Sequence, residues 1–356
     1  MCTPEPCTAE LLGAGAEAAE EILGGVFRID KALDPLDPDG FMGIVRRLAR
    51  ALRGVARPAE DSALRRAIER LDVDWPNLAP QARDQVVRAA RQALQGVEAQ
   101  VLPAMDHVFE VEGERVVAGT RRSTVRRLGL LIGADLSATD QRIARFVRES
   151  QGNFVRDEYG RRREVFTRRA KELVATGMER GLGRDDIVDE LAKTMAGAAF
   201  DRSRNYWEVV AMVFANRARS STQLAAFEEA AIERFRFDAI LDEVTSEVCR
   251  FMHGRVFSVS KAMDSFRQVE RARDPERIRD LQPFVQVGAD REGNEVLFYQ
   301  RGGRRRAVAR VDESGVGEAD KIGRYSKQLS SQQLERAGVT APPLHGRCRS
   351  TITAEV

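Results

Sequence analysis

The 356-residue chain is poor in the residue types that most often carry chemistry, with only four cysteines and three histidines. Four cysteines in a chain of this length do not make a disulfide framework, so we expect a reducing compartment such as a bacterial cytoplasm. No run of about 18 apolar residues occurs, which excludes a membrane-spanning helix. The N-terminal stretch also lacks the basic and apolar regions of a secretory signal.

The charge is nearly balanced, and its positive half is almost entirely arginine. The net charge is +2, and only six of the 57 basic residues are lysine. This balance excludes a globally basic, nucleic-acid-binding surface. The arginine bias fits either the base composition of a GC-rich genome or contact with phosphates and carboxylates, for which the guanidinium fork is suited.

Three segments concentrate the arginines, and we weigh them as sites of non-specific DNA contact. They are 121–127, 161–169 and 301–306. Few aromatic residues lie among them, so base stacking is not indicated, and the simpler explanation is a solvated helix face with nearby acids. The last segment is predicted at a hairpin turn, so it supplies the DNA-contact candidates, which are Arg301, Arg304, Arg305 and Arg306.

The first part of the chain is predicted to be helical after a tail and linker at residues 1–39. Apolar residues recur at helical spacing over 40–133. They predict one helix near 41–55 and a second helix that starts at a cap formed by Asp61 or Ser62. Residues 107–119 are expected to form a small β element, because Glu-Gly separates two short β-branched runs there.

Longer helices are predicted over residues 134–234. After residue 235 the helical spacing of apolar residues gives way to patterns typical of strands. The stretch at 205–235 fits one long helix or two with a break near Ser220. Beyond it, "RFRFDAIL" alternates as a strand does, and "RVFSV" is predicted to be another strand. The stretch at 283–311 is predicted to form two or three strands, with turns at "ADREGN" and "RGGRRR". We therefore expect an α+β protein, with a helix-rich N-terminal two-thirds and a small C-terminal module with β-hairpins over 235–356.

Two Cys/His pairs stand out in a chain with so few of either residue. Cys249 and His253 are four residues apart, and His345 and Cys348 are three apart. If Thr245 or Ser246 caps a short helix, Cys249 sits in its first turn, where the helix dipole lowers a thiol's pKa. Two thiolates and two imidazoles at such spacings form a plausible tetrahedral zinc set, with Asp242 as an alternative ligand.

Two other interpretations of these pairs stay open. The ordinary one is a small buried cysteine near a histidine. The other is an enzyme centre, in which Cys249 is the nucleophile, His345 the base and Asp242 the orienting group. No phosphate-binding loop, zinc-protease motif or nucleophile elbow is present to indicate a different catalytic site.

Residues 236–257 and 341–352 resemble the two signature blocks of phage head-morphogenesis proteins, the Mu F-like or minor-capsid family of tailed bacteriophages. The matching residues are Asp242, Thr245, Ser246, Cys249 and Gly254, and then Pro342, Pro343, His345, Cys348 and Arg349. The likeness extends over residues 140–356. Gly346 stands where the family usually has proline, and Ser350 stands where many relatives have a second cysteine.

The resemblance implies a minor structural protein that acts in procapsid assembly near the portal. Its partners would be portal, major capsid or scaffold proteins, with non-specific DNA as a further one, and it would be oligomeric within a particle in the virion or host cytoplasm. Two alternatives from other classes are a metal- or Cys/His-dependent hydrolase or toxin on the same module, and a DNA-binding accessory protein.

Overall fold

The computed structural model describes residues 33–199 and 204–355. Most of the tail expected at 1–39, with Cys2 and Cys7, lies outside these residues. The predicted α+β class is confirmed, because long helices make up the first part of the chain and two small antiparallel sheets lie in the last part. The described residues form two compact units, a helical unit (49–108 and 154–207) and an α+β unit (33–48, 109–153 and 208–355).

The helical unit takes segments of three long helices and all of three shorter elements. Its core includes Trp75, whose indole nitrogen donates a hydrogen bond of 2.9 Å to the Leu71 carbonyl. Tyr159 and Glu60 are also buried there and are joined at 2.8 Å. The elements are α2 (Pro38–Leu71), η1 (Trp75–Asn77), α3 (Pro80–Ala93), α4 (Val97–Leu128), α5 (Ala138–Glu179) and α6 (Arg184–Ala199). Helices α2, α4 and α5 also supply residues to the α+β unit.

The break expected near Asp61 is wrong, since α2 is one helix that contains Pro58. The buried apolar residues of α2 continue across the proline, with Leu52 and Ala56 before it and Leu64 after it. Pro58 itself is exposed. Burial on both sides outweighs the hydrogen bond that a proline removes from a helix.

The β element expected at 107–119 is also wrong, because these residues belong to α4. Their β-branched and aromatic side chains are buried as a helix face, among them Val108, Phe109 and Val116. Gly113 is not a turn residue, since a Cβ there would lie 3.3 Å from the Phe214 ring and glycine permits this close approach. Tertiary packing has overridden the local strand preference.

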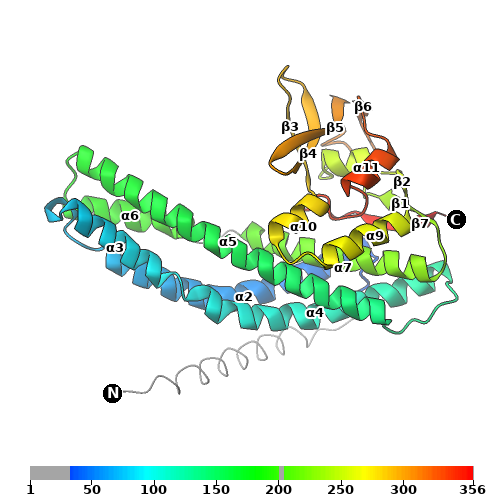
Figure 1. Cartoon of the computed structure of the whole chain (residues 1–356), viewed down its shortest axis with the longest axis horizontal. Helices are drawn as coiled ribbons and strands as arrows, with labels where there is room; N and C mark the ends of the chain where they lie inside the picture. Colours follow the sequence, from blue (N-terminus) through cyan, green and yellow to red (C-terminus); the bar gives the residue numbers. More distant parts are fainter. Residues whose placement is uncertain (1–32, 200–203, 356) are drawn as a thin grey trace. The chain divides into compact units, whose positions relative to one another are not determined.

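The α+β unit contains both sheets, whose strands are antiparallel (Figure 1). The three-stranded sheet has the order β2-β1-β7, and the four-stranded sheet has the order β3-β4-β5-β6. The strands are β1 (Arg234–Asp238), β2 (Val256–Ser258), β3 (Val285–Ala289), β4 (Glu295–Arg301), β5 (Arg304–Glu313), β6 (Arg324–Ser326) and β7 (Thr351–Glu355). The helices between them are α8 (Glu247–Met252), α9 (Val259–Glu270), α10 (Pro275–Leu281) and α11 (Ser331–Ala337).

Strand β1 is central in its sheet and shows why this stretch folds as a strand. Phe235 and Phe237 are buried while Arg234 is exposed, which is the alternation of a half-buried strand. Phe235 lies opposite Phe257 of β2, and Phe237 lies opposite Ile352 of β7. The strand predictions for "RFRFDAIL", "RVFSV" and the hairpins at 283–311 are therefore confirmed.

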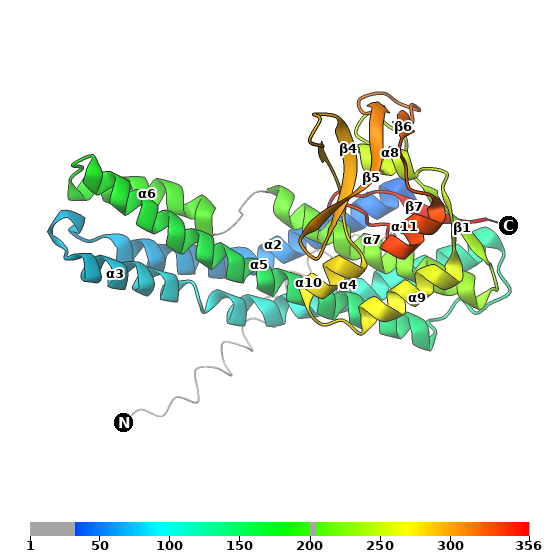
Figure 2. The same ribbon diagram turned by 45° about the horizontal axis from the view of Figure 1, so that its top comes forward.

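Helix α7 (Arg204–Glu229) is continuous, and its residues 210–227 are all buried. It runs beside β7 in both views of the chain (Figures 1 and 2). Three polar side chains at helical spacing face the segment that leads into β7. The Asn216 amide donates to the Cys348 carbonyl at 2.6 Å, and the Gln223 amide donates to the Ile352 carbonyl at 2.8 Å.

Arg219 is the centre of this polar stripe, which comprises Asn216, Arg219 and Gln223. Its guanidinium donates to the carbonyls of Arg349 at 3.0 Å, Ser350 at 2.6 Å and Pro35 at 3.2 Å. It also lies over the Phe41 ring, 3.7 Å from the centroid. Burial lowers the pKa of Arg219 to about 10, so the group stays charged at neutral pH.

We predict that Arg219→Met lowers the free energy of unfolding by about 3 kcal/mol or more, because it leaves the carbonyls of Pro35 and Arg349 without this donor and removes the stronger of two donors to Ser350. Urea unfolding measures this. The matched control is Arg142→Met, which breaks only the exposed ion pair between Arg142 and Glu270 and should cost less than about 1 kcal/mol. Equal losses in the two variants would contradict the role given to the stripe.

Candidate metal centre

Three side chains from the two Cys/His pairs meet in the α+β unit. The Cys249 sulfur lies 3.7 Å from the Cys348 sulfur and 3.1 Å from Nε2 of His345. One ligand atom from each residue lies within 4.8 Å of the other two. Both cysteines are buried and His345 is half-buried. Two segments 96 residues apart therefore form one cluster that can hold a metal ion.

Helix α8 sets the position of Cys249. Ser246 is its N-cap, and the serine hydroxyl accepts a hydrogen bond of 3.3 Å from the Cys249 amide, as the cap prediction expected. The same hydroxyl lies 2.8 Å from Nε2 of His345. After the helix, Gly254 adopts a φ of 77°, a left-handed conformation suited to glycine, and its amide donates to Phe237 of β1. The cap and the glycine thus fix the helix at both ends.

The closing segment at 344–350 sets the positions of the other two ligands. The Cys348 amide donates to the His345 carbonyl at 3.3 Å, so the two residues share one turn. The Leu344 carbonyl accepts from the Val285 amide at the start of β3. A Cβ at Gly346 would lie 2.9 Å from Cγ1 of Val209, so glycine allows this turn to approach α7 closely.

The spacing of the sulfurs suits a tetrahedral ion. Two sulfurs bound at about 2.3 Å to a tetrahedral zinc lie about 3.8 Å apart, close to the 3.7 Å between Cys249 and Cys348. The ring of His345 accepts a hydrogen bond of 3.3 Å at Nδ1 from the Arg347 amide. In that tautomer Nε2 carries the proton and donates, so metal binding through Nε2 would require the proton to leave this atom.

The surroundings of the two thiols shift their pKa values in opposite directions. The hydrogen bond to Cys348 and burial raise the pKa of Cys249 well above its ordinary value. Burial also raises the pKa of Cys348, but hydrogen bonds from Cys249 and His345 outweigh it and hold this pKa well below the ordinary value. Of the two thiols, Cys348 is therefore the one whose surroundings favour the thiolate, and the Arg219 guanidinium interacts favourably with it. The expectation that the helix dipole lowers the pKa of Cys249 is wrong, because burial and the neighbouring sulfur dominate.

Two residues proposed as ligands from the sequence lie outside the cluster. Nδ1 of His253 accepts a hydrogen bond of 3.1 Å from the Ala239 amide and lies 3.8 Å from the Asp238 carboxylate. Asp242 is held by Arg349 at 2.6 Å and by the Thr245 hydroxyl at 2.7 Å. The expected four-ligand set is thereby corrected to the three residues Cys249, His345 and Cys348 within the described part of the chain.

Asp242 acts in this geometry as a clamp on the closing segment. Its carboxylate binds Arg349, the residue directly after Cys348. Thr245 holds the turn that presents the carboxylate, since its hydroxyl donates to Asp242 and accepts from the Asp242 amide at 3.1 Å. Hydrogen bonds from Arg349 and Thr245 outweigh burial and lower the pKa of Asp242 to about 2.

Sequence reasoning missed Arg250, a completely buried arginine of α8 next to Cys249. Its guanidinium donates to the carbonyls of Thr245 at 3.1 Å and Glu318 at 2.8 Å, and also to those of Asp242 and Lys321. It thus holds the loop after β5 against α8. Nothing in the local sequence indicates that Arg250 is buried. The polar stripe of α7 could have been predicted, because a run of polar residues interrupts the apolar sequence of that helix.

The arginine clusters differ in their partners. Arg121 is buried, 3.0 Å from Asp140 and 2.8 Å from Glu229. In the second cluster, Arg161 and Arg162 pair with Glu158. These contacts support the simpler interpretation of arginines balanced by nearby acids.

The hairpin differs from the prediction, because its turn is Gly302–Gly303 and residues 304–306 are the first of β5. Arg304, Arg305 and Arg306 are exposed, and Arg305 lies over the Phe298 ring at 4.6 Å. Arg301 is not at an exposed tip, because its guanidinium donates to two backbone carbonyls. Three of the four DNA-contact candidates therefore remain available at the surface.

Comparison with protein-family models, curated proteins and solved structures found no match to this chain. Among the described residues, no helix is both long enough and apolar enough to span a membrane.

The lowered pKa of Asp242 predicts an acid-dependent loss of stability. Its folded pKa of about 2 lies below the usual 3.8, so its contribution is present above about pH 4 and disappears as the pH falls towards 2. In urea unfolding, wild type should exceed Asp242→Asn in stability by a constant amount at pH 5–7. That difference should shrink below pH 4. A difference that is the same at pH 3 and pH 6 would contradict the assignment.

Proposed function

We propose that Cys249, His345 and Cys348 bind a Zn²⁺ ion that fastens the closing segment to α8, in a minor structural protein of a tailed-phage or prophage head. The observation that carries the zinc proposal is the convergence of three soft ligand atoms within 4.8 Å of one another. Cysteine and histidine are the ligands that zinc prefers in structural sites. An ion that joins α8 to the closing segment would stabilise the C-terminal module, whose sheets are small.

Burial favours a structural role for the ion. Cys249 and Cys348 are 3% and 0% exposed, whereas a metal-bound nucleophile has to reach its substrate. Among the described residues no carboxylate orients the imidazole, because Nδ1 of His345 accepts from the Arg347 amide and Asp242 is bound by Arg349. A catalytic Cys/His pair normally needs such an orienting group.

One observation favours the hydrolase alternative. Three protein ligands leave a fourth zinc position for water, which is the arrangement of catalytic zinc sites. The nearest hydroxyl to Nε2 of His345 is that of Ser246, at 2.8 Å. A structural site would fill this fourth position with that hydroxyl or with a sequestered water.

The head-assembly role rests on the family resemblance, and the structure supports it through the roles of the matching residues. Asp242 clamps Arg349, Ser246 caps α8, and Gly254 takes the left-handed conformation after it. Residues that match the two signature blocks thus all position α8 or the closing segment at 344–350. The partners would be portal, major capsid or scaffold proteins, within an oligomeric particle.

DNA contact is a secondary part of the same proposal. Arg304, Arg305 and Arg306 are exposed at the start of β5. Side chains of adjacent strand residues point to opposite faces, so the three guanidiniums do not form one continuous surface. This arrangement supports weak, salt-sensitive contact with phosphates and no sequence specificity.

We predict about one zinc ion per chain in purified protein, measured by inductively coupled plasma mass spectrometry. His345→Ala and Cys348→Ser should lose the ion and unfold at a lower temperature. A strong chelator should lower the unfolding temperature of wild type and leave that of the variants unchanged.

Two matched controls are available for this measurement. His253→Ala removes a residue that lies outside the cluster, and Cys2→Ser/Cys7→Ser removes the other two thiols. Both should retain the ion. Metal-free wild type with the same stability as Cys348→Ser would rule out the zinc site, and hydrolytic activity lost with the ion would favour the enzyme.

The assembly role predicts that the chain copurifies with heads. Particles induced from the bacterium that carries the gene should contain it by mass spectrometry, and deletion of the gene should leave incomplete procapsids in electron micrographs. If deletion leaves particle number and morphology unchanged and the chain stays in the particle-free fraction, the role is wrong, whatever the metal content.

A further inference from the structure

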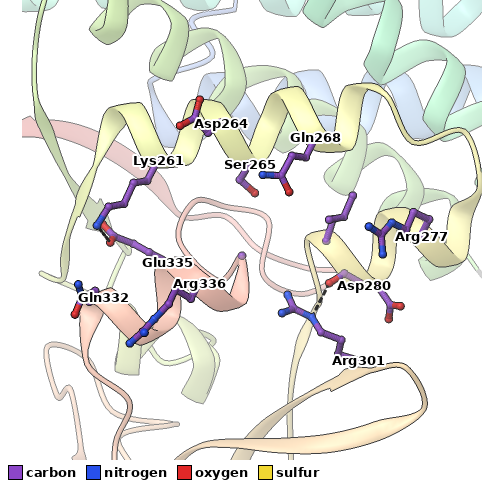
Figure 3. A pocket seen from close by; sticks show the side chains of 12 residues that line it. Lys261, Asp264, Ser265, Gln268, Arg277, Asp280, Arg301, Gln332, Glu335 and Arg336 are labelled. Carbon is purple, nitrogen blue, oxygen red and sulfur yellow. Dashed lines mark hydrogen bonds and ion pairs between the residues drawn. The ribbon is translucent and has the colours of Figure 1, made fainter.

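A cavity of about 610 Å³ opens in the α+β unit between α9, α10, α11 and the end of β4 (Figure 3). None of the residues that line it belongs to the metal centre. Its size falls within the range of ligand pockets, roughly 300–1,000 Å³. Polar and charged side chains dominate its walls, so it is suited to a charged ligand.

Arg301 supplies a positioned cation in this cavity. Its Nε donates to the Asp280 carbonyl at 3.0 Å, and one terminal nitrogen donates to the Ala337 carbonyl at 2.7 Å. Both acceptors are neutral, so the charge of the guanidinium is not compensated by an acid at these contacts. The other terminal nitrogen is left to donate to a ligand.

Two further arginines line the cavity from other elements, Arg277 from α10 and Arg336 from α11. Both side chains are exposed, and within residues 33–199 and 204–355 neither makes an ion pair or a hydrogen bond. Figure 3 shows Arg301 and Arg336 on the same side of the hollow, across from Gln268 of α9. Three elements thus each supply to the lining one guanidinium that has no acidic partner among the described residues.

The acids of the cavity mostly have partners. Glu335 accepts from Lys261 at 2.8 Å, and Asp264 accepts from Arg267 at 2.9 Å. Asp280 accepts the Gly302 amide at 3.0 Å. The cavity is therefore positive at its arginines and carries carboxylates around them.

This mixture favours a peptide over a nucleic acid. Carboxylates of the ligand can pair with Arg277, Arg301 and Arg336, and its backbone amides and carbonyls match the donors and acceptors of Gln268 and Gln332. A duplex presents only phosphates to such a site and is too wide to enter a hollow of this size.

We propose that this cavity binds an acidic peptide segment of a partner protein, with Arg277, Arg301 and Arg336 as the residues that hold its carboxylates. The proposal depends neither on the zinc site nor on the head-assembly role. It assigns a chemical class of ligand to a surface that the metal centre does not use.

The test is fluorescence anisotropy of fluorescein-labelled pentaglutamate with the full-length protein. Wild type should bind saturably, and Arg277→Gln/Arg336→Gln should bind at least about tenfold more weakly, as expected for the loss of charged hydrogen bonds. Both side chains are exposed, so the variant should fold, which circular dichroism checks. The matched control is Arg304→Gln, which removes the same charge outside the cavity and should change affinity less than about twofold.

Competition decides the class of ligand. Unlabelled pentaglutamate should displace the probe at a lower concentration than inorganic phosphate or a short DNA duplex does. The proposal is overturned by a lack of saturable binding, by an equal loss in Arg304→Gln, or by displacement at lower concentrations of phosphate or duplex.

Discussion

The α+β unit depends on the hydrogen bonds that the polar stripe of α7 makes with the backbone of residues 348–352. Asn216, Arg219 and Gln223 each donate to carbonyls there, from a helix that is buried throughout residues 210–227. Unmet carbonyls in such a place would cost about 1–3 kcal/mol each. The stripe therefore sets the register of β7 against β1 and, with it, the position of Cys348.

The metal centre is the second fastening of the same segment. Cys249, positioned by the cap of α8, contacts His345 of this segment. Asp242 binds Arg349, the residue directly after Cys348. Arg250 holds the neighbouring loop by its carbonyls alone. Buried arginines here serve as multiple donors to backbone oxygens, which gives the arginine-rich composition a structural explanation in this unit besides that of genome composition.

Much of the α+β unit could be predicted from the sequence, because β1 alternates cleanly, the hairpin turns are marked by glycines and the Ser246 cap is local. The pairing of Cys249 with His345 and Cys348 also followed from the rarity of these residues. The continuity of α2 through Pro58 and the helical state of 107–119 could not be predicted, since burial on distant partners decided both. His253 was misassigned because spacing does not reveal that its ring faces the Ala239 amide.

The two cysteines are separated by 99 positions in the sequence, which has a consequence for biosynthesis. At about 5–20 residues per second, the ribosome needs roughly 5–20 s to make the second cysteine after the first. During that interval α7 and α8 lack the partners that residues 345–352 supply. The nascent chain thus passes through a stage that a chaperone or an early assembly partner could recognise.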